Sequence, residues 1–285
     1  MTDLFHRAGD LLRPLSDRLL ALIASSDVVQ ADETSMKVQA DEKCRLGFVW
    51  TFLTDKLIAY RFAPSRSGET PREILGGTKG ALVVDAYSGY NDVASVEGRS
   101  RVGCHAHVRR YFYEALPTAP EARQALEFIL ELYRVEHEAK EKDIVRTEAH
   151  LKLRRERCRP IRAQFRQWLE EQKDNHPPKS PMAIAIRYTL NNWEVLGRFV
   201  ENERLPLDNN ASESALRRVA LGRNFLFAGN DEAGRNIAGL YSLVATCEAN
   251  GVNPVAFIAD VLMRVQTQPM SRLDELLPPN WGPSG

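Results

Sequence analysis

The feature that most constrains the fold of this chain is a set of three strand-like segments. Segments 27–39, 45–54 and 56–65 are rich in β-branched and aromatic residues, and polar turns at 40–43 and 55–56 separate them. Connections this short join antiparallel neighbours in a sheet. We therefore predict three antiparallel strands in this part of the chain.

Helices and further strands are predicted around these three segments. Leu and Ile recur at helical spacing over 4–25, where Pro14 marks a break or kink. A short helix at 70–77 precedes the apolar run 80–87, which is typical of a strand buried on both faces. The other predicted elements are a strand at 99–106, helices at 107–116, across 119–205, at 233–251 and at 253–266, and an extended Pro-rich tail from 268.

The order of these elements predicts an α/β protein with a ribonuclease-H-like mixed sheet flanked by helices. In such a fold the first and fourth strands lie side by side at the centre of the sheet. The charged helical block before Glu213 is then an insertion into the core. The predicted divisions are a helical lead-in at 1–26, the first part of the core at 27–118, the insertion at 119–205, the core completion at 206–267 and the tail at 268–285.

Three acidic residues form the candidate site. Asp32 and Asp85 end apolar runs, and Glu213 begins a helical segment. Three carboxylates from two strand ends and a helix can hold two divalent metal ions about 3.5–4 Å apart, as in many nucleases and polymerases. Each acid also has a structural interpretation. Asp32 could face solvent and Asp85 could cap a turn, while Glu213 could complete a capping box with Asn210 or pair with Arg217.

Basic residues suggest where phosphates would bind. Arg109 and Arg110 follow the segment Cys104-His105-Ala106-His107, which lacks the second ligand pair that a structural zinc site needs. We therefore interpret this segment as the start of a phosphate-contacting helix. A second group of cations is predicted either to contact phosphates or to form an ordinary charged helix face. Its members are Lys152, Arg154, Arg155, Arg157, Arg159, Arg162 and Arg166.

Composition narrows the class of protein further. The net charge is zero and the pI is near 7.0, so any nucleic-acid binding depends on local basic patches. The four cysteines are scattered without a CxxC pair, which is typical of free thiols in a reducing compartment. No stretch approaches the ~20 apolar residues of a membrane span. We expect a soluble cytoplasmic protein with no membrane partner, associated with the nucleoid when bound to DNA.

Ordered motifs along most of the chain resemble those of one transposase family. They are ADET at 31–34, RFAPSRSGETP at 61–71, LGG at 75–77, VDAYSGY at 84–90, GCHAHVRR at 103–110, LDNNASESALR at 207–217, GRN at 222–224, FAG at 227–229, YSL at 241–243 and NGVNP at 250–254. The chain is similar to transposases of the insertion-sequence 66 family, in their DDE catalytic region and short C-terminal extension.

The resemblance implies specific chemistry and partners. Asp32, Asp85 and Glu213 would be the metal-binding acids of a two-metal transposase, with Mg²⁺ as cofactor and Mn²⁺ able to substitute. Of the neighbours Asp32 and Glu33, only one can face the metals, and the family pattern selects Asp32. The implied partners are DNA at the transposon ends and target, further copies of the chain on DNA, and accessory proteins of the same element. Arg217 and Arg223 join the arginines above as candidate phosphate contacts.

Two departures from the family pattern leave alternatives open. His105 stands where the family usually has Trp, and the usual N-terminal zinc-finger-like and helix-turn-helix region does not precede the first strand. We therefore expect a truncated copy, a fragment or a split-gene product. The alternative functions are a non-catalytic DNA-binding or assembly remnant and a ribonuclease-H-like nuclease without strand transfer.

Overall fold

The computed structural model describes residues 2–40, 43–95, 97–222 and 228–282, which fall into two compact units. The core unit consists of the described parts of 1–82, 87–100 and 211–285. The helical unit consists of 83–86 and 101–210. Both units are built around contacts between segments that lie far apart in the sequence.

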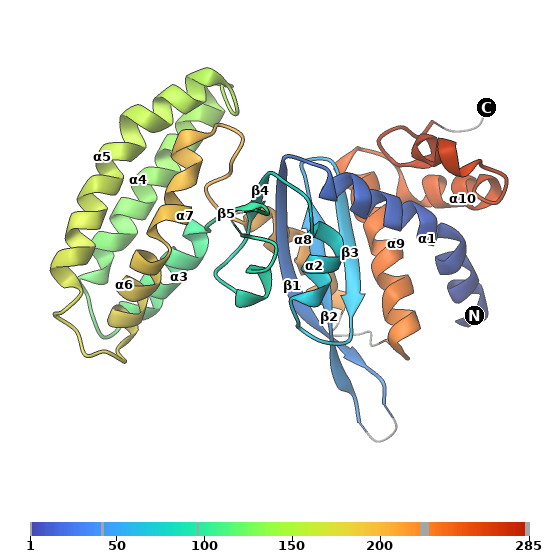
Figure 1. Ribbon diagram of the computed structural model, residues 1–285, viewed down its shortest axis with the longest axis horizontal. Helices are drawn as coiled ribbons and strands as arrows, with labels where there is room; N and C mark the ends of the chain where they lie inside the picture. Colours follow the sequence, from blue (N-terminus) through green and yellow to red (C-terminus); the bar gives the residue numbers. More distant parts are fainter. Residues whose placement is uncertain (1, 41–42, 96, 223–227, 283–285) are drawn as a thin grey trace. The chain divides into compact units, whose positions relative to one another are not determined.

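A five-stranded sheet runs through the described residues (Figure 1). Neighbouring strands β1 and β2 are antiparallel, and so are β2 and β3. The three antiparallel strands and the adjacency of the first and fourth strands are therefore confirmed. In spatial order the strands are β3 (Ile58–Ala63), β2 (Arg45–Leu53), β1 (Val28–Val38), β4 (Ala81–Val83) and β5 (Ser100–Val102).

Burial explains why β2 is an interior strand. Trp50, Thr51 and Phe52 are fully buried, so the strand is covered on both faces rather than on alternate residues. Continuous β-branched and aromatic runs suit such a position.

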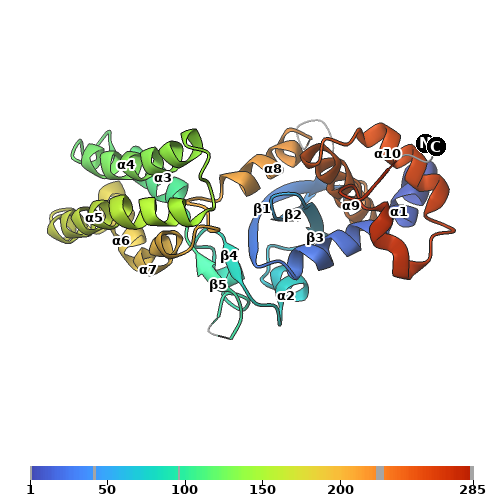
Figure 2. The same cartoon turned by 90° about the horizontal axis from the view of Figure 1, so that it is seen from above.

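Helix α9 protects the edge of the sheet at β3. Ser242 accepts a hydrogen bond from the Tyr60 N–H at 2.8 Å, and Thr246 accepts one from the Ile58 N–H at 3.1 Å. The exposed donors of an edge strand are thereby satisfied, which prevents pairing with another sheet. Helices α1 and α9 lie side by side against this edge (Figures 1 and 2). The core-unit helices are α1 (Thr2–Ala24), α2 (Glu69–Leu75), α8 (Asn210–Gly222), α9 (Asp231–Ala249), α10 (Pro254–Arg264), and the 3-10 turns η1 (Ser88–Tyr90) and η3 (Met270–Leu276).

Two expectations about the ends of the chain need correction. Pro14 does not break the first helix, because α1 continues through it to Ala24. The tail is not extended, because residues 270–276 form a 3-10 segment with Leu273 and Leu276 buried. Arg18 of α1 holds this segment by donating to both carboxylate oxygens of Asp274, at 2.6 and 2.7 Å. None of the described helices is long and apolar enough to cross a membrane.

The helical unit packs around an aromatic and aliphatic core. Phe112, Phe165, Ile129 and Leu169 are buried at its centre. Residues 119–205, all of which the structure describes, contain no strand, as the sequence predicted. Helices α4 and α5 lie side by side in both views (Figures 1 and 2). The helices are α3 (His105–Ala115), α4 (Ala122–Glu141), α5 (Glu148–Gln172), α6 (Pro181–Asn191) and α7 (Trp193–Gly197), followed by the 3-10 turn η2 (Arg198–Glu201).

Candidate active site

Asp32 lies in the interior of β1, opposite Thr51 of β2. The sequence placed it at a strand end, which is wrong because β1 continues to Val38. The residue is half-buried, and its Oδ1 accepts the Glu33 N–H at 2.9 Å. A carboxylate on a central strand has a rigid backbone beneath it, which is what a metal ligand requires.

The adjacent acid, Glu33, is held by other side chains. Its side chain is only 2% exposed. Oε1 accepts hydrogen bonds from Arg66 Nε at 2.8 Å and from Arg66 Nη2 at 2.6 Å, and Oε2 accepts one from the Tyr90 hydroxyl at 2.7 Å. Arg66 and Tyr90 therefore hold both carboxylate oxygens of Glu33. The selection of Asp32 as the metal-binding member of the pair stays a prediction.

Asp85 belongs to the helical unit and follows β4 by two residues. The Val84 N–H donates to the Val102 carbonyl at 3.1 Å, which fixes the backbone just before it. Asp85 Oδ2 lies 3.9 Å from His107 Nε2, a separation longer than a hydrogen bond. His107 was not selected from the sequence, because the Cys-His-Ala-His segment was weighed as a zinc motif and as the start of a phosphate-contacting helix, and not as a neighbour of Asp85.

The start of α3 binds the segment that leads towards Glu213. Cys104 Sγ accepts the Asn209 N–H at 3.3 Å, and His105 Nδ1 lies 3.0 Å from the Leu207 carbonyl. Burial raises the pKa of the Cys104 thiol to about 12 and lowers the pKa of His105 to about 3. Both side chains are therefore neutral near pH 7 and hold the backbone of 207–209.

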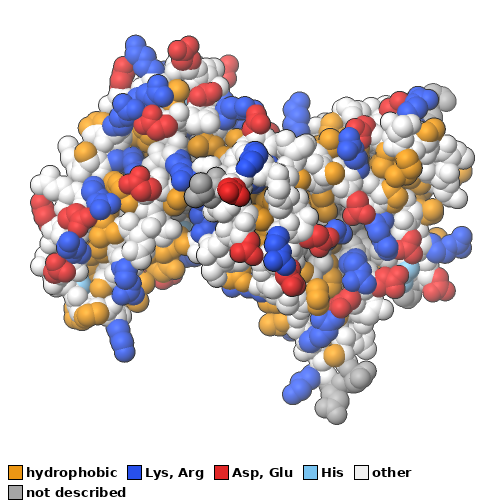
Figure 3. All heavy atoms as spheres, viewed as in Figure 1, with side chains coloured by type: hydrophobic (Ala, Val, Ile, Leu, Met, Phe, Trp, Pro, Cys, Tyr) orange, Lys and Arg blue, Asp and Glu red, His pale blue; other side chains and the backbone are white. Residues whose placement is uncertain are grey.

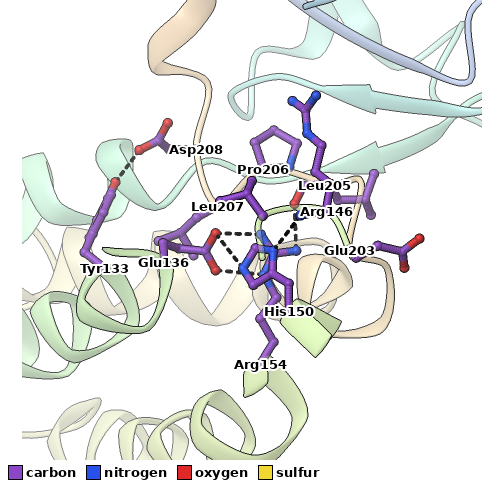
Figure 4. Close-up of a pocket in the computed structure, with 11 residues that line it drawn as sticks. Tyr133, Glu136, Arg146, His150, Arg154, Glu203, Leu205, Pro206, Leu207 and Asp208 are labelled. Atoms are coloured by element: carbon purple, nitrogen blue, oxygen red, sulfur yellow. Dashed lines mark hydrogen bonds and ion pairs between the residues drawn. The ribbon is translucent and has the colours of Figure 1, made fainter. Parts of the chain in front are cut away.

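A pocket of about 240 Å³ lies next to the same segment (Figure 4). Arg154, with 2% exposure, donates to Glu136 Oε1 at 2.7 Å and Oε2 at 2.6 Å. Its Nη1 also donates to the carbonyls of Phe199 and Leu205, at 3.0 and 2.9 Å. The guanidinium thus ties α4 and α5 to the chain that leads into α8. The pocket is lined by Tyr133, Glu136, Val145, Arg146, His150, Arg154, Glu203, Leu205, Pro206, Leu207 and Asp208.

Asp208 organises the entry into α8. It accepts the Tyr133 hydroxyl at 2.6 Å, the Asn210 N–H at 3.0 Å and the Asn210 side-chain amide at 2.7 Å. The Asn210 N–H is the donor that a capping box would direct to Glu213. Glu213 itself is exposed in the first turn of α8, with exposed Arg217 one turn further on. The role of Glu213 as a metal-binding acid rather than a helix cap stays a prediction.

The three acids are divided between the units. Asp32 and Glu213 belong to the core unit, and Asp85 belongs to the helical unit. Within the described part of the chain, no group of three or more His, Cys, Asp or Glu residues is arranged to hold a metal ion. The donor chemistry fits Mg²⁺, which prefers carboxylate oxygens. The convergence of the three acids stays a prediction.

Comparison with known proteins establishes the family. Residues 1–236 match the family described as "Transposase IS66 family", and residues 242–278 match the IS66 C-terminal element. The chain belongs to the IS66 transposase family. It is 31% identical to the uncharacterized protein y4hP of Sinorhizobium fredii over 99% of this chain, and 32% identical to y4qI of the same organism over 96%. The chain spans 55% and 54% of the lengths of these two relatives.

The basic candidates of this IS66 chain differ in exposure. Arg109 and Arg110 are exposed on α3, and Arg217 is exposed on α8. Arg223 lies outside the described residues. Exposed guanidinium groups can reach phosphates without rearrangement, so Arg109, Arg110 and Arg217 remain candidates for phosphate contacts.

On α5 the exposed arginines face acids from other elements. Arg157 lies 3.4 Å from Glu138, while Arg159 and Arg155 lie 2.8 and 3.5 Å from Glu201. Over α4 and α5 in Figure 3, basic and acidic side chains are interspersed. These exposed pairs are weak, so phosphate groups can compete for the arginines.

The two inner arginines of α5 have structural contacts. Arg154 makes the buried contacts described above. Arg162 donates to the carbonyls of Leu196 and Trp193, both at 3.1 Å, and its guanidinium lies 4.3 Å from the centre of the Trp193 ring. Burial lowers the pKa of Arg162 to about 10. Both residues therefore stabilise the helical unit through contacts within it.

Proposed function

We propose that this chain is the catalytic portion of a DNA transposase that cleaves DNA and transfers strands through Asp32, Asp85 and Glu213. The observation that carries the proposal is the family match over residues 1–236, which includes all three acids. The sheet order supports a ribonuclease-H-like core, because β1, which carries Asp32, neighbours β4, which Asp85 follows.

The proposed chemistry depends on divalent metal ions. Asp32, Asp85 and Glu213 would hold two Mg²⁺ ions, for which Mn²⁺ can substitute. When bound, such ions activate the attacking water or 3′-hydroxyl and stabilise the leaving oxygen of a phosphodiester. The protein side chains then only position their oxygens, and no covalent enzyme intermediate is needed.

The proposed partner is DNA, at both the transposon ends and the target. Arg109, Arg110 and Arg217 are exposed candidates for phosphate contacts, and Arg155, Arg157 and Arg159 form a second group on α5. Phosphate contacts position a protein on the duplex but carry no sequence information. We also propose that copies of the chain assemble on DNA, with accessory proteins of the same element as further partners and the nucleoid as the site of action.

Nicking of a supercoiled plasmid that carries element ends tests the proposal. We expect Mg²⁺-dependent nicking by the wild-type chain and none by Asp32→Asn, because the substitution removes the charge that would bind the metal. Asp92→Asn is the matched control. It makes the same substitution at an aspartate whose side chain is 64% exposed and which follows Asp85 closely in the sequence. Nicking without strand joining would favour a nuclease, and DNA binding without nicking would favour a non-catalytic remnant.

A further inference from the structure

We propose that Glu33 is a positioning residue that holds the chain immediately after Asp85 on the core unit. The inference rests on the proposed function of Asp85 as a metal ligand. Tyr87 follows Asp85 by two residues, so the Cα atom of Asp85 lies within roughly 7 Å of the Cα atom of Tyr87. Glu33, Arg66 and Tyr90 hold Tyr87 in place through contacts within the core unit, and this restricts where Asp85 can lie.

The first contact is the hydrogen bond from Tyr90 to Glu33. The Tyr90 side chain is fully buried and donates its hydroxyl to Glu33 Oε2 at 2.7 Å. The Tyr90 ring also packs edge-on against Trp50, with ring centres 5.6 Å apart. Trp50 lies opposite Glu33 in the register of β1 and β2. Tyr90 is therefore held against both β1 and β2.

The second contact runs through Arg66. Its guanidinium donates twice to Glu33 Oε1 and lies 4.1 Å from the centre of the Tyr87 ring. The Tyr87 hydroxyl donates in turn to the Arg66 carbonyl. Arg66 therefore links the carboxylate of Glu33 to Tyr87, which follows Asp85 by two residues. Removing the charge of Glu33 would release the guanidinium from its place over the ring.

The third contact is a close approach of two backbones. A Cβ atom on Gly68 would lie 2.6 Å from the Gly89 carbonyl oxygen, which real structures do not tolerate. The loop that carries Arg66 thus packs directly on the turn η1, and glycine is required at 68 for that approach. A Gly68→Ala substitution pushes the same turn away without touching Glu33, which gives a second and independent variant.

Amide hydrogen exchange without metal tests whether Glu33 holds this segment. Within it the Asn91 N–H donates to Ser88 and the Ala94 N–H donates to Tyr90, both at 2.9 Å. In Glu33→Gln and in Tyr90→Phe we expect these amides to exchange at least about tenfold faster, because a hydrogen bond to a charged group is weakened or lost. Amides of β2 serve as the internal reference and are expected to keep their wild-type rates.

The matched control is Glu73→Gln, since Glu73 pairs with Arg61 but is 65% exposed. In this variant we expect the Asn91 and Ala94 amides to exchange at the wild-type rate. Unchanged exchange in both Glu33→Gln and Tyr90→Phe would overturn the inference. Gly68→Ala should also speed the exchange of the Asn91 and Ala94 amides. Wild-type exchange of these amides in Gly68→Ala would count against the inference.

Cleavage kinetics separate positioning from DNA binding. With Mg²⁺ present, we expect Glu33→Gln to lower kcat at least about tenfold and to leave the KM for DNA within about twofold, since Glu33 would touch no DNA. A raised KM with unchanged kcat would contradict the inference. If Asp85→Asn itself keeps full activity, the proposed function fails. If Asp85→Asn is inactive and Glu33→Gln is normal, only the present inference fails.

Discussion

At the residue scale, two adjacent carboxylates on β1 have different surroundings. Glu33 accepts hydrogen bonds from Arg66 and Tyr90, whereas Asp32 is half-buried with its Oδ1 close to the next backbone N–H. Strand alternation predicted that only one of them could face a metal site. The partners of Glu33 lie 33 and 57 residues away, so the sequence alone could not show that Arg66 and Tyr90 bind its carboxylate.

Replacing buried Arg154 should lower the free energy of unfolding far more than replacing the adjacent Arg155. Replacing Arg154 with Met leaves Glu136 without its bidentate partner, and we expect a loss of roughly 3–5 kcal/mol in unfolding free energy. Arg155→Met is the control, because Arg155 is 44% exposed, and we expect a change within about 0.5 kcal/mol. Urea denaturation measures both. Equal losses in the two variants would show that the buried network does not stabilise the unit.

His105 should make stability depend on pH. Its folded pKa, about 3, lies below the ordinary value of 6.5, so the unfolded chain binds more protons at acidic pH. Its contribution is complete above pH 6.5 and is lost progressively as pH falls towards 3. Between pH 7 and 5 we expect a loss of up to about 2 kcal/mol, with buried His150 acting in the same direction.

Denaturant midpoints at several pH values measure this effect. His105→Gln should show a smaller loss on acidification than the wild type. His137→Gln is the control, because His137 is 71% exposed, and it should behave like the wild type. An identical pH dependence in His105→Gln and the wild type would contradict the assignment.

At the scale of elements, periodicity predicted the antiparallel strands and the helices because each has an amphipathic or buried pattern of its own. It did not predict the 3-10 segment at 270–276, whose order depends on Arg18 in the first helix. The basic character of α5 was visible in the sequence. The acids that face it, from α4 and η2, were not, because they come close only in the folded chain.

The exposed arginines of α5 should contribute to salt-sensitive DNA binding. We expect non-specific binding whose log affinity falls by roughly 0.9 per neutralised phosphate per log unit of salt. Replacing Arg155, Arg157 and Arg159 together with Ala should reduce that slope by up to about three contacts. Fluorescence anisotropy with an arbitrary duplex at several salt concentrations measures the slope.

The matched control for α5 is a triple Ala variant of exposed or half-exposed arginines in the core unit, namely Arg13, Arg264 and Arg272. Its salt slope should stay near that of the wild type. An unchanged slope in the α5 variant would mean that its pairs with Glu138 and Glu201 are an ordinary charged surface.

At the scale of the whole molecule, the three candidate acids are divided between the units, with Asp32 and Glu213 in the core unit and Asp85 in the helical unit. The sequence divided the chain at 119 and 205, whereas the helical unit consists of 83–86, which includes Asp85, and 101–210, which includes all of α3. Those sequence-based divisions stay a prediction. The acids were candidates from their places near element ends, but a single Asp or Glu there has many structural roles, and the family motifs were needed to favour a catalytic role for the set. The family match confirms the resemblance and leaves the catalytic roles as proposals.

Strand transfer on labelled element ends, measured in Mg²⁺ with Asp85→Asn beside the wild type, tests the central claim most directly. We expect joined products from the wild type, none after the metal is removed with EDTA, and none from Asp85→Asn although its fold and DNA binding persist. The Asp92→Asn control should join ends at the wild-type rate. Wild-type joining by Asp85→Asn would contradict the assignment of Asp85 as a metal-binding acid.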